Sequence, residues 1–258
     1  MRLRSGLVAG VALLGAVALY AQQVAAPETT GYAAKDGLVD AARYLPPPPV
    51  PGSDADRSDR AAVAAGRAQA RADAKLAAAA VAELHMRSPE ARVRMLCAVD
   101  ARLTPENAPT FYRLMLRTGR DLSAASSASK DAWKRPRPFV GAATPDTCYP
   151  ADDADWKSGL GWAYPSGHAG IGWLWGMILS EVAPDRAADA LKWGANVGDH
   201  RIACGVHYPS DIAAGRMLGS AVFARIAANP EFRADLDAAK AEVAAIRAKG
   251  ERPAGCPA

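Results

Sequence analysis

The stretch at residues 169–182 constrains the fold more than any other part of this chain. It reads Ala-Gly-Ile-Gly-Trp-Leu-Trp-Gly-Met-Ile-Leu-Ser-Glu-Val, so apolar or small residues occupy almost every position. A helix that is apolar on nearly all sides must be surrounded by other elements. Residues 165–167, Pro-Ser-Gly, stand where this helix would begin. We therefore expect one central helix enclosed by others.

Helical patterns also fill most of the remaining chain. Apolar side chains recur at helical spacing across residues 109–134. Other helices are expected at residues 54–86, 184–198, 212–228 and 230–249, several of which follow a capping residue or a proline. No segment reads as a strand, alanine is abundant and aromatic residues make up only 7% of the chain. The prediction is an all-α, single-domain helical bundle held together by close packing of small side chains.

The first 26 residues have the pattern of a secretory signal peptide. Basic residues at its start precede an apolar run at residues 6–20 and small residues at 24–26. An uncleaved membrane anchor is the alternative, but the run is shorter than the ~20 residues of a spanning helix. We expect the mature protein to be exported to the periplasm. A Pro-rich extended segment then covers residues 27–53, the helical domain residues 54–250 and a C-terminal tail residues 251–258.

The charge of the chain argues against some partners. The formal net charge of +4 falls to +2 once Arg2 and Arg4 leave with the signal peptide. So small an excess gives no reason to expect a nucleic-acid partner. No later stretch is long and apolar enough to span a membrane. The sequence does not indicate the number of subunits, so both a monomer and a homo-oligomer are compatible with it.

Four cysteines, at positions 97, 148, 204 and 256, would lie in an oxidising compartment after export. Four cysteines allow three disulfide connectivities, and spacing alone does not choose among them. Cys148 and Cys204 both flank polar blocks described next, which favours that pair. No two cysteines have the close spacing of a metal site.

Three short blocks collect most of the reactive polar side chains. The first runs from Lys130 to Arg137, the second is Pro-Ser-Gly-His at residues 165–168, and the third holds Arg201, His207 and Asp211. Lys130, Arg137 and Arg201 can surround the oxygens of a phosphate. Ser166 and Gly167 begin a helix, whose free amides favour an anion. This inventory suits a site that holds a phosphate and attacks it.

The two histidines of these blocks supply the groups for acid–base and nucleophilic work. Cleavage through a covalent intermediate needs a nucleophile and a proton donor for the leaving oxygen. Asp211 follows His207 by four residues and could hold one of its ring nitrogens, or act as an acid at a helix start beside Pro209. No cluster of Asp, His or Cys outside the blocks suggests a metal site, so we expect no metal and no cofactor.

The order and spacing of the three blocks resemble the signature of the type 2 phosphatidic acid phosphatase superfamily. Longer stretches, among them Tyr44 with its prolines and residues 161–173, look like the class A bacterial non-specific acid phosphatases of that superfamily. The resemblance implies the all-α fold of the acid phosphatase and vanadium haloperoxidase type. It also implies metal-independent hydrolysis of diverse small-molecule phosphate monoesters at acid pH, with possible phosphotransferase activity.

The resemblance also assigns roles to residues. His207 would be the nucleophile and would become a phosphohistidine, His168 the general acid, and Asp211 their catalytic partner. Phosphate would bind to a set that comprises Lys130, Arg137, Ser166, Gly167 and Arg201. Lys134 and Arg135 match nothing in the signature and are expected on the surface. His200 stands where the family usually has serine, and Ala163 and Ala169 also replace common polar residues.

Two other functions fit part of this pattern. A vanadate-dependent haloperoxidase would use the same cradle, since vanadate mimics phosphate, but the chain is short for one. A non-catalytic exported phosphate-binding protein would keep the cations but would need neither His168 nor His207. The presence of both histidines favours the acid phosphatase.

Overall fold

The structure, a computed structural model, describes residues 30–33 and 40–256. The signal peptide expected at residues 1–26 lies outside the described residues. Within them the chain is helical and contains no strand, which confirms the all-α prediction. The elements are η1 (Ala41–Arg43), α1 (Asp54–Ala72), α2 (Ala74–Ala82), α3 (Pro89–Val99), α4 (Pro109–Trp133), α5 (Ala154–Lys157), α6 (Gly167–Val182), η2 (Pro184–Arg186), α7 (Ala187–Ala203), α8 (Pro209–Ala227) and α9 (Pro230–Ala248).

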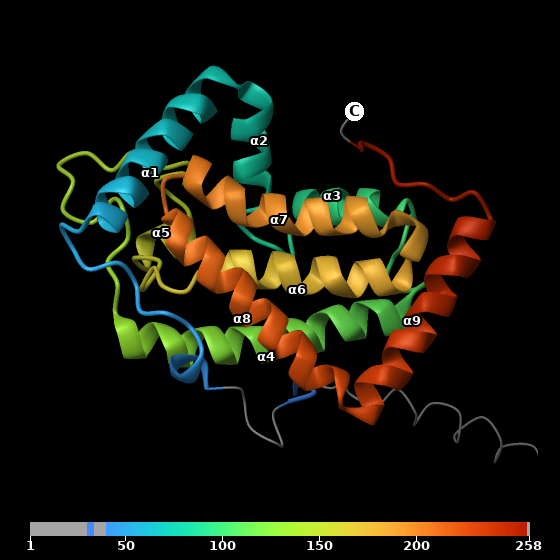
Figure 1. Cartoon of the computed structure of the whole chain (residues 1–258). Helices are drawn as coiled ribbons and strands as arrows, with labels where there is room; N and C mark the ends of the chain where they lie inside the picture. Colours follow the sequence, from blue (N-terminus) through green and yellow to red (C-terminus); the bar gives the residue numbers. More distant parts are fainter. Residues whose placement is uncertain (1–29, 34–39, 257–258) are drawn as a thin grey trace, which may run out of the picture.

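Helix α6 lies at the centre of the bundle, as its composition predicts. It runs between α7 and α4, α8 crosses it, and α9 packs near its C-terminal end (Figure 1). Leu174, Ile178 and Leu179 of α6 are completely buried. They belong to one core that also takes Phe111 from α4 and Leu218 from α8. Because α6 supplies this core on several faces, it fixes the positions of the helices around it.

Helix ends follow local rules of capping. Ser166 precedes α6 and its hydroxyl accepts a hydrogen bond from the Ala169 amide at 3.3 Å, while Asn229 caps α9 in the same way. Asp73 interrupts the helix expected at residues 54–86, because its carboxylate accepts from the amides of Lys75 and Leu76 and starts α2. Helix α7 continues past the expected end at residue 198 to Ala203.

Two disulfide bonds close the structure. Cys148 bonds to Cys204, which confirms the expected pair, and Cys97 bonds to Cys256. The Cys148–Cys204 bond joins the long loop after α4 to the end of α7. The Cys148 amide also donates to the Cys204 carbonyl at 2.9 Å. Among the described helices none has both the length and the apolar character needed to cross a membrane.

The backbones of α6 and α7 touch where glycines face each other. A Cβ atom added to Gly194 of α7 would overlap the carbonyl group of Gly172 in α6. Helix α8 approaches the other side in the same manner, since a Cβ on Gly219 would lie 2.6 Å from the Gly170 carbonyl oxygen. Gly119 of α4 differs, because a Cβ there would meet Trp175 at an ordinary 3.4 Å. Close approach of the helices therefore requires glycine at the α6–α7 and α6–α8 crossings but not at Gly119.

This difference predicts opposite effects of two similar substitutions. Gly194→Ala should lower the free energy of unfolding by about 1–3 kcal/mol, because rigid backbone must move apart. Gly119→Ala should leave it unchanged or raise it by up to about 1 kcal/mol through helix propensity. Urea denaturation of both variants with the disulfides intact measures the difference. Equal effects would show that the α6–α7 crossing is not tightly packed.

Candidate active site

The three polar blocks meet at one end of the bundle. Lys130 lies in the last turn of α4, Arg201 in the last turn of α7, and Gly167 and His168 in the first turn of α6. Arg137 and His207 lie in the loops that follow α4 and α7. The Ser166 amide donates to the Asp211 carbonyl at 3.0 Å, which joins the starts of α6 and α8. The fold thus gathers all the residues that the sequence singled out.

His207 is held at both ring nitrogens. Its Nδ1 lies 3.2 Å from Asp211 Oδ2, and its Nε2 lies 3.1 Å from Arg137 Nη1. Since an ionised carboxylate only accepts, the contact with Asp211 favours the proton on Nδ1 and leaves a lone pair on Nε2. Burial lowers the pKa of His207 well below its usual range, and the charges of Arg137 and Lys130 lower it further. A neutral imidazole with a fixed lone pair is suited to attack phosphorus.

Asp211 has both of the roles that the sequence allowed. Besides His207, its Oδ2 accepts from the Tyr208 amide at 2.8 Å and so caps the start of α8. Its other oxygen accepts from Arg135 Nη1 at 2.7 Å. The carboxylate is completely buried, and burial raises its pKa while Arg135 opposes this.

Arg135 corrects one prediction. Because neither Lys134 nor Arg135 matches the family signature, both are expected on the surface. Lys134 is exposed, but Arg135 is buried. Its guanidinium donates to Asp59 of α1 at 2.8 Å as well as to Asp211, and lies 4.1 Å from the centre of the Tyr208 ring. These two carboxylates, with that of Asp56 at 3.8 Å, balance its charge inside the protein. Arg135 therefore positions Asp211, and through it the ring of His207.

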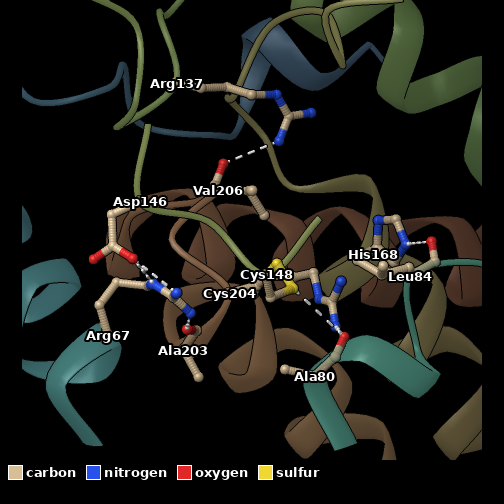
Figure 2. The surroundings of a disulfide bond; sticks show 11 residues. Arg67, Ala80, Leu84, Arg137, Asp146, Cys148, His168, Ala203, Cys204 and Val206 are labelled. Carbon is tan, nitrogen blue, oxygen red and sulfur yellow. Dashed lines mark hydrogen bonds and ion pairs between the residues drawn. A yellow bond between two sulfur atoms is a disulfide. The ribbon is translucent and has the colours of Figure 1, made fainter. Parts of the chain in front are cut away.

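The three other cations are held by backbone carbonyls rather than by acids. Arg137 donates to the carbonyls of Leu160, Gly161 and Val206 at 2.7–2.9 Å. Lys130 Nζ donates to the Trp162 carbonyl. Arg201, completely buried, donates from Nη2 to the Ala80 carbonyl. Figure 2 shows Arg137 above Val206 on one side of the Cys148–Cys204 bond and His168 beside Leu84 on the other.

Buried donors remain without a partner in this region. Within the part of the chain that the structure describes, Nε and Nη1 of Arg201 and the hydroxyl of Ser126 form no hydrogen bond. Ser126 faces the start of α6, since a Cβ on Gly167 would lie 3.4 Å from its Oγ. Unpaired buried donors are costly, and an anion with several oxygens would satisfy them. Sequence reasoning did not find Ser126, because one more serine in a serine-rich helix carries no signal.

His168 donates from Nε2 to the Leu84 carbonyl at 3.0 Å, so a further proton would add at Nδ1. Burial lowers its pKa to about 3, with contributions from the charges of Arg201, Arg137 and Lys130. In the absence of an anion the ring is therefore neutral near pH 7. A bound phosphate would offset the three cations and raise the pKa of His168 toward the range of a proton donor.

A cavity of about 480 Å³ opens onto this region. Lys130, Ser126, Gly167 and His168 line it, together with His85 and Asp155 at its edge. His207 and Arg201 are not among its lining residues and are almost completely buried. The cavity thus reaches the candidate phosphate-binding groups from the side of α4 and the start of α6.

His85 corrects the expectation that no further cluster exists. Its Nε2 lies 2.8 Å from Asp153 Oδ2 and its Nδ1 3.5 Å from Asp155 Oδ2, and one ligand atom from each residue lies within 4.8 Å of the others. No sequence pattern indicates this cluster, because His85 lies 68 residues from Asp153. Asp153 also caps α5, so its position has a structural cause without any ion.

His200 also has a defined partner. Its Nδ1 lies 2.6 Å from Oε2 of Glu83, a completely buried carboxylate whose other oxygen accepts from Arg94 at 2.9 Å. His200 therefore joins the end of α7 to the segment after α2, next to the helix residue Arg201. Within the described residues, the side-chain hydrogen bond of His200 reaches none of the catalytic candidates.

Comparison with known proteins identifies the family of the chain. The model of the PAP2 superfamily matches residues 115–233, a span that contains every candidate from Lys130 to Asp211. The non-specific acid phosphatase of Providencia stuartii is 34% identical and covers 84% of this chain and 86% of the relative. The acid phosphatase of Zymomonas mobilis is 33% identical, with 88% and 83% covered. The non-specific acid phosphatase of Salmonella typhimurium is 33% identical, with 78% of each covered.

This chain belongs to the PAP2 superfamily. The resemblance found in the three blocks is therefore confirmed for the family and extends over most of the chain. The individual roles of His207, His168 and the cations remain predictions, to which the contacts above now give a geometry.

The position of His200 predicts a small effect on catalysis. In His200→Ser, Glu83 keeps Arg94 as a partner, so the end of α7 should stay in place. We expect kcat/KM for a generic aryl phosphate to stay within roughly tenfold, or ~1.4 kcal/mol in the barrier. A loss as large as that of His168→Ala would show instead that His200 takes part in the reaction.

The pKa of Lys130 predicts the alkaline limb of the pH profile. Burial, followed by the charge of Arg137, lowers this pKa to about 7. Above that pH Lys130 loses its charge, so capture of the phosphate should weaken and kcat/KM, which reports the free enzyme, should fall. In Lys130→Arg the charge persists and the limb should move to higher pH.

Profiles of both enzymes with one substrate check this, because ionisation of the substrate is then common to both. If the alkaline limb stayed where it was in Lys130→Arg, another group would have to set it.

Proposed function

We propose that this protein is an exported acid phosphatase that hydrolyses phosphate monoesters of broad structure through a phosphohistidine intermediate. The observation that carries the proposal is the arrangement of His207, with Nδ1 on Asp211 and Nε2 directed to Arg137. The names of the relatives, acid phosphatases in each case described above, support the reaction class.

The phosphoryl group would bind at the start of α6, where helix amides and three cations converge. Unpaired donors of Arg201 and Ser126 support this position, since phosphate oxygens would complete their hydrogen bonds. Negative charge that develops on the equatorial oxygens would be stabilised by groups that are already in place. The protein itself supplies the positive charge that balances these oxygens, which supports a reaction without a metal.

In the first step, Nε2 of His207 forms a bond to phosphorus while the bond from phosphorus to the ester oxygen breaks. The leaving oxygen takes a proton from His168 and departs as an alcohol. In the second step, a water oxygen bonds to phosphorus while the bond from phosphorus to Nε2 of His207 breaks; the water gives up a proton to His168, and inorganic phosphate leaves the neutral imidazole. Another alcohol in place of water would give a new ester, which is the basis for phosphotransferase activity.

The electrostatics of the two histidines supports activity at acid pH. His207 stays neutral in acid, because its pKa is lowered by burial and by Arg137 and Lys130. His168 needs a proton, and its low pKa rises only when an anion is bound. Acid conditions supply that proton without silencing the nucleophile. The loss of the Lys130 charge at higher pH, which lowers kcat/KM on the alkaline side of the profile, also favours activity at acid pH.

Export to the periplasm rests on separate support. The signal-like residues 1–26 provide one reason, and the two disulfide bonds provide another, because such bonds persist in oxidising compartments.

The test is to trap the intermediate. The wild-type protein, mixed with an aryl phosphate and quenched rapidly without acid, should carry phosphate on His207 by mass spectrometry. His207→Ala should lose both the label and turnover, whereas His85→Ala, at the edge of the cavity, should retain the label. Both should be measured with and without chelator, which should have no effect. Label on Ser166, a wild-type rate in His207→Ala, or restoration by Mg²⁺ or Zn²⁺ would overturn the proposed mechanism.

A further inference from the structure

A groove leads away from the phosphate site along α4. The cavity that reaches His168 shares the wall residues Met86, Gly119 and Ile171 with a second cavity of about 510 Å³. The second cavity in turn shares Met86, Met115 and Trp175 with a third of about 220 Å³. Because neighbouring cavities share wall residues, they adjoin one another along α4, and the first of them begins at the candidate proton donor.

The far part of this groove is apolar. Its wall combines long, flexible side chains with two aromatic ones from α3, α4, α6 and the segment after α2: Met86, Met95, Tyr112, Met115, Leu116 and Trp175. The polar atoms of the aromatic residues are already bonded, since Trp175 Nε1 donates to Thr118 at 3.3 Å and the Tyr112 hydroxyl donates to the Leu103 carbonyl at 2.9 Å. The wall therefore offers carbon and sulfur, which adapt to apolar ligands of varied shape.

Three arginines, Arg87, Arg92 and Arg120, line these cavities together with the apolar side chains. Arg87 lines all three cavities and is exposed, and Arg92 lies over the Tyr112 ring at 5.5 Å. No acid lines the second or third cavity among the described residues. An anionic head group near Lys130 and a neutral tail along α4 would both find complementary surroundings.

The position of the groove beside the proposed phosphate site indicates which part of the substrate it holds. When a phosphate monoester lies with its phosphorus near His207 and its ester oxygen near His168, the remainder of the alcohol must leave through the cavity that His168 lines. We propose that this groove binds the apolar alcohol portion of the substrate, so that phosphate monoesters with long alkyl or arylalkyl chains are preferred. This inference rests on the proposed phosphatase function and names the substrate class of the same site.

Gly119 allows a sharp test, because it lies where the first and second cavities meet. A Cβ there would lie 3.4 Å from Trp175 and 3.5 Å from Ile171, so a small addition fits and a larger side chain would enter the groove. Gly119→Leu should block the path to the apolar part, while Gly119→Ala should obstruct it little. Ala128→Leu is the matched control, because Ala128 is exposed on the same helix and lines none of the three cavities.

The experiment measures kcat/KM for phosphate release from n-alkyl phosphates, from ethyl to decyl, below their micelle concentrations. In the wild-type protein and in Ala128→Leu, kcat/KM should rise by about two- to fourfold for each methylene group that enters the groove. In Gly119→Leu the ratio of decyl to ethyl phosphate should fall by at least tenfold. Inhibition by n-alkyl phosphonates, which are not hydrolysed, should show the same dependence on chain length.

The possible outcomes separate the two proposals. Hydrolysis that does not depend on chain length would refute the proposal that the groove binds the alkyl chain, but it would not affect the proposed phosphatase function. If phosphonates bound with an affinity that depends on chain length but no alkyl phosphate were hydrolysed, the proposed phosphatase function would be refuted and the binding groove supported. A preference that appears only above the micelle concentration would mean attraction to an aggregated surface. If Gly119→Leu changed the oligomeric state with no change in selectivity, the groove would be a contact between subunits, and the proposal would be wrong.

Discussion

Contact between the backbones of α6, α7 and α8 is the constraint on which the active end of the molecule depends. Where Gly172 and Gly194 face each other, no side chain separates the two helices, and Gly215 similarly lies against the Ser166 carbonyl group. These crossings bring the start of α6, the end of α7 and the start of α8 to one place. A positive helix terminus, the guanidinium of Arg201 and the imidazole of His207 thereby converge from the ends of three helices. Tight packing of small residues is thus also the means by which the phosphate site is assembled.

Burial gives that site its chemistry. One guanidinium, that of Arg135, has its charge balanced by carboxylates and holds Asp211 and Asp59 together. Arg137 and Arg201 have carbonyl partners instead, so their charges remain available inside the protein. The same charges lower the pKa values of both histidines. A phosphate that enters would relieve this unbalanced charge, and binding and activation of the proton donor would then occur together.

The sequence predicted what depends on neighbours in the chain. Prolines and capping residues located the starts of α6, α8 and α9, the apolar stretch at residues 169–182 indicated the central helix, and block spacing identified the candidate site. It could not predict contacts set by the tertiary fold. Arg135 and Lys134 look alike in sequence, and only the approach of Asp59 from α1 buries one of them. Glu83 beside His200, and Asp153 beside His85, are brought close in the same way across long separations.

The connectivity of the two disulfide bonds determines how the chain responds to a single proteolytic cut. The Cys148–Cys204 bond lies within the segment enclosed by Cys97 and Cys256, so helices α4 to α9 form part of a covalent ring. A protease that cuts one peptide bond anywhere inside this ring opens it without releasing a fragment. The ends produced stay tethered to the same core, and the nicked chain keeps all of its packing partners within reach.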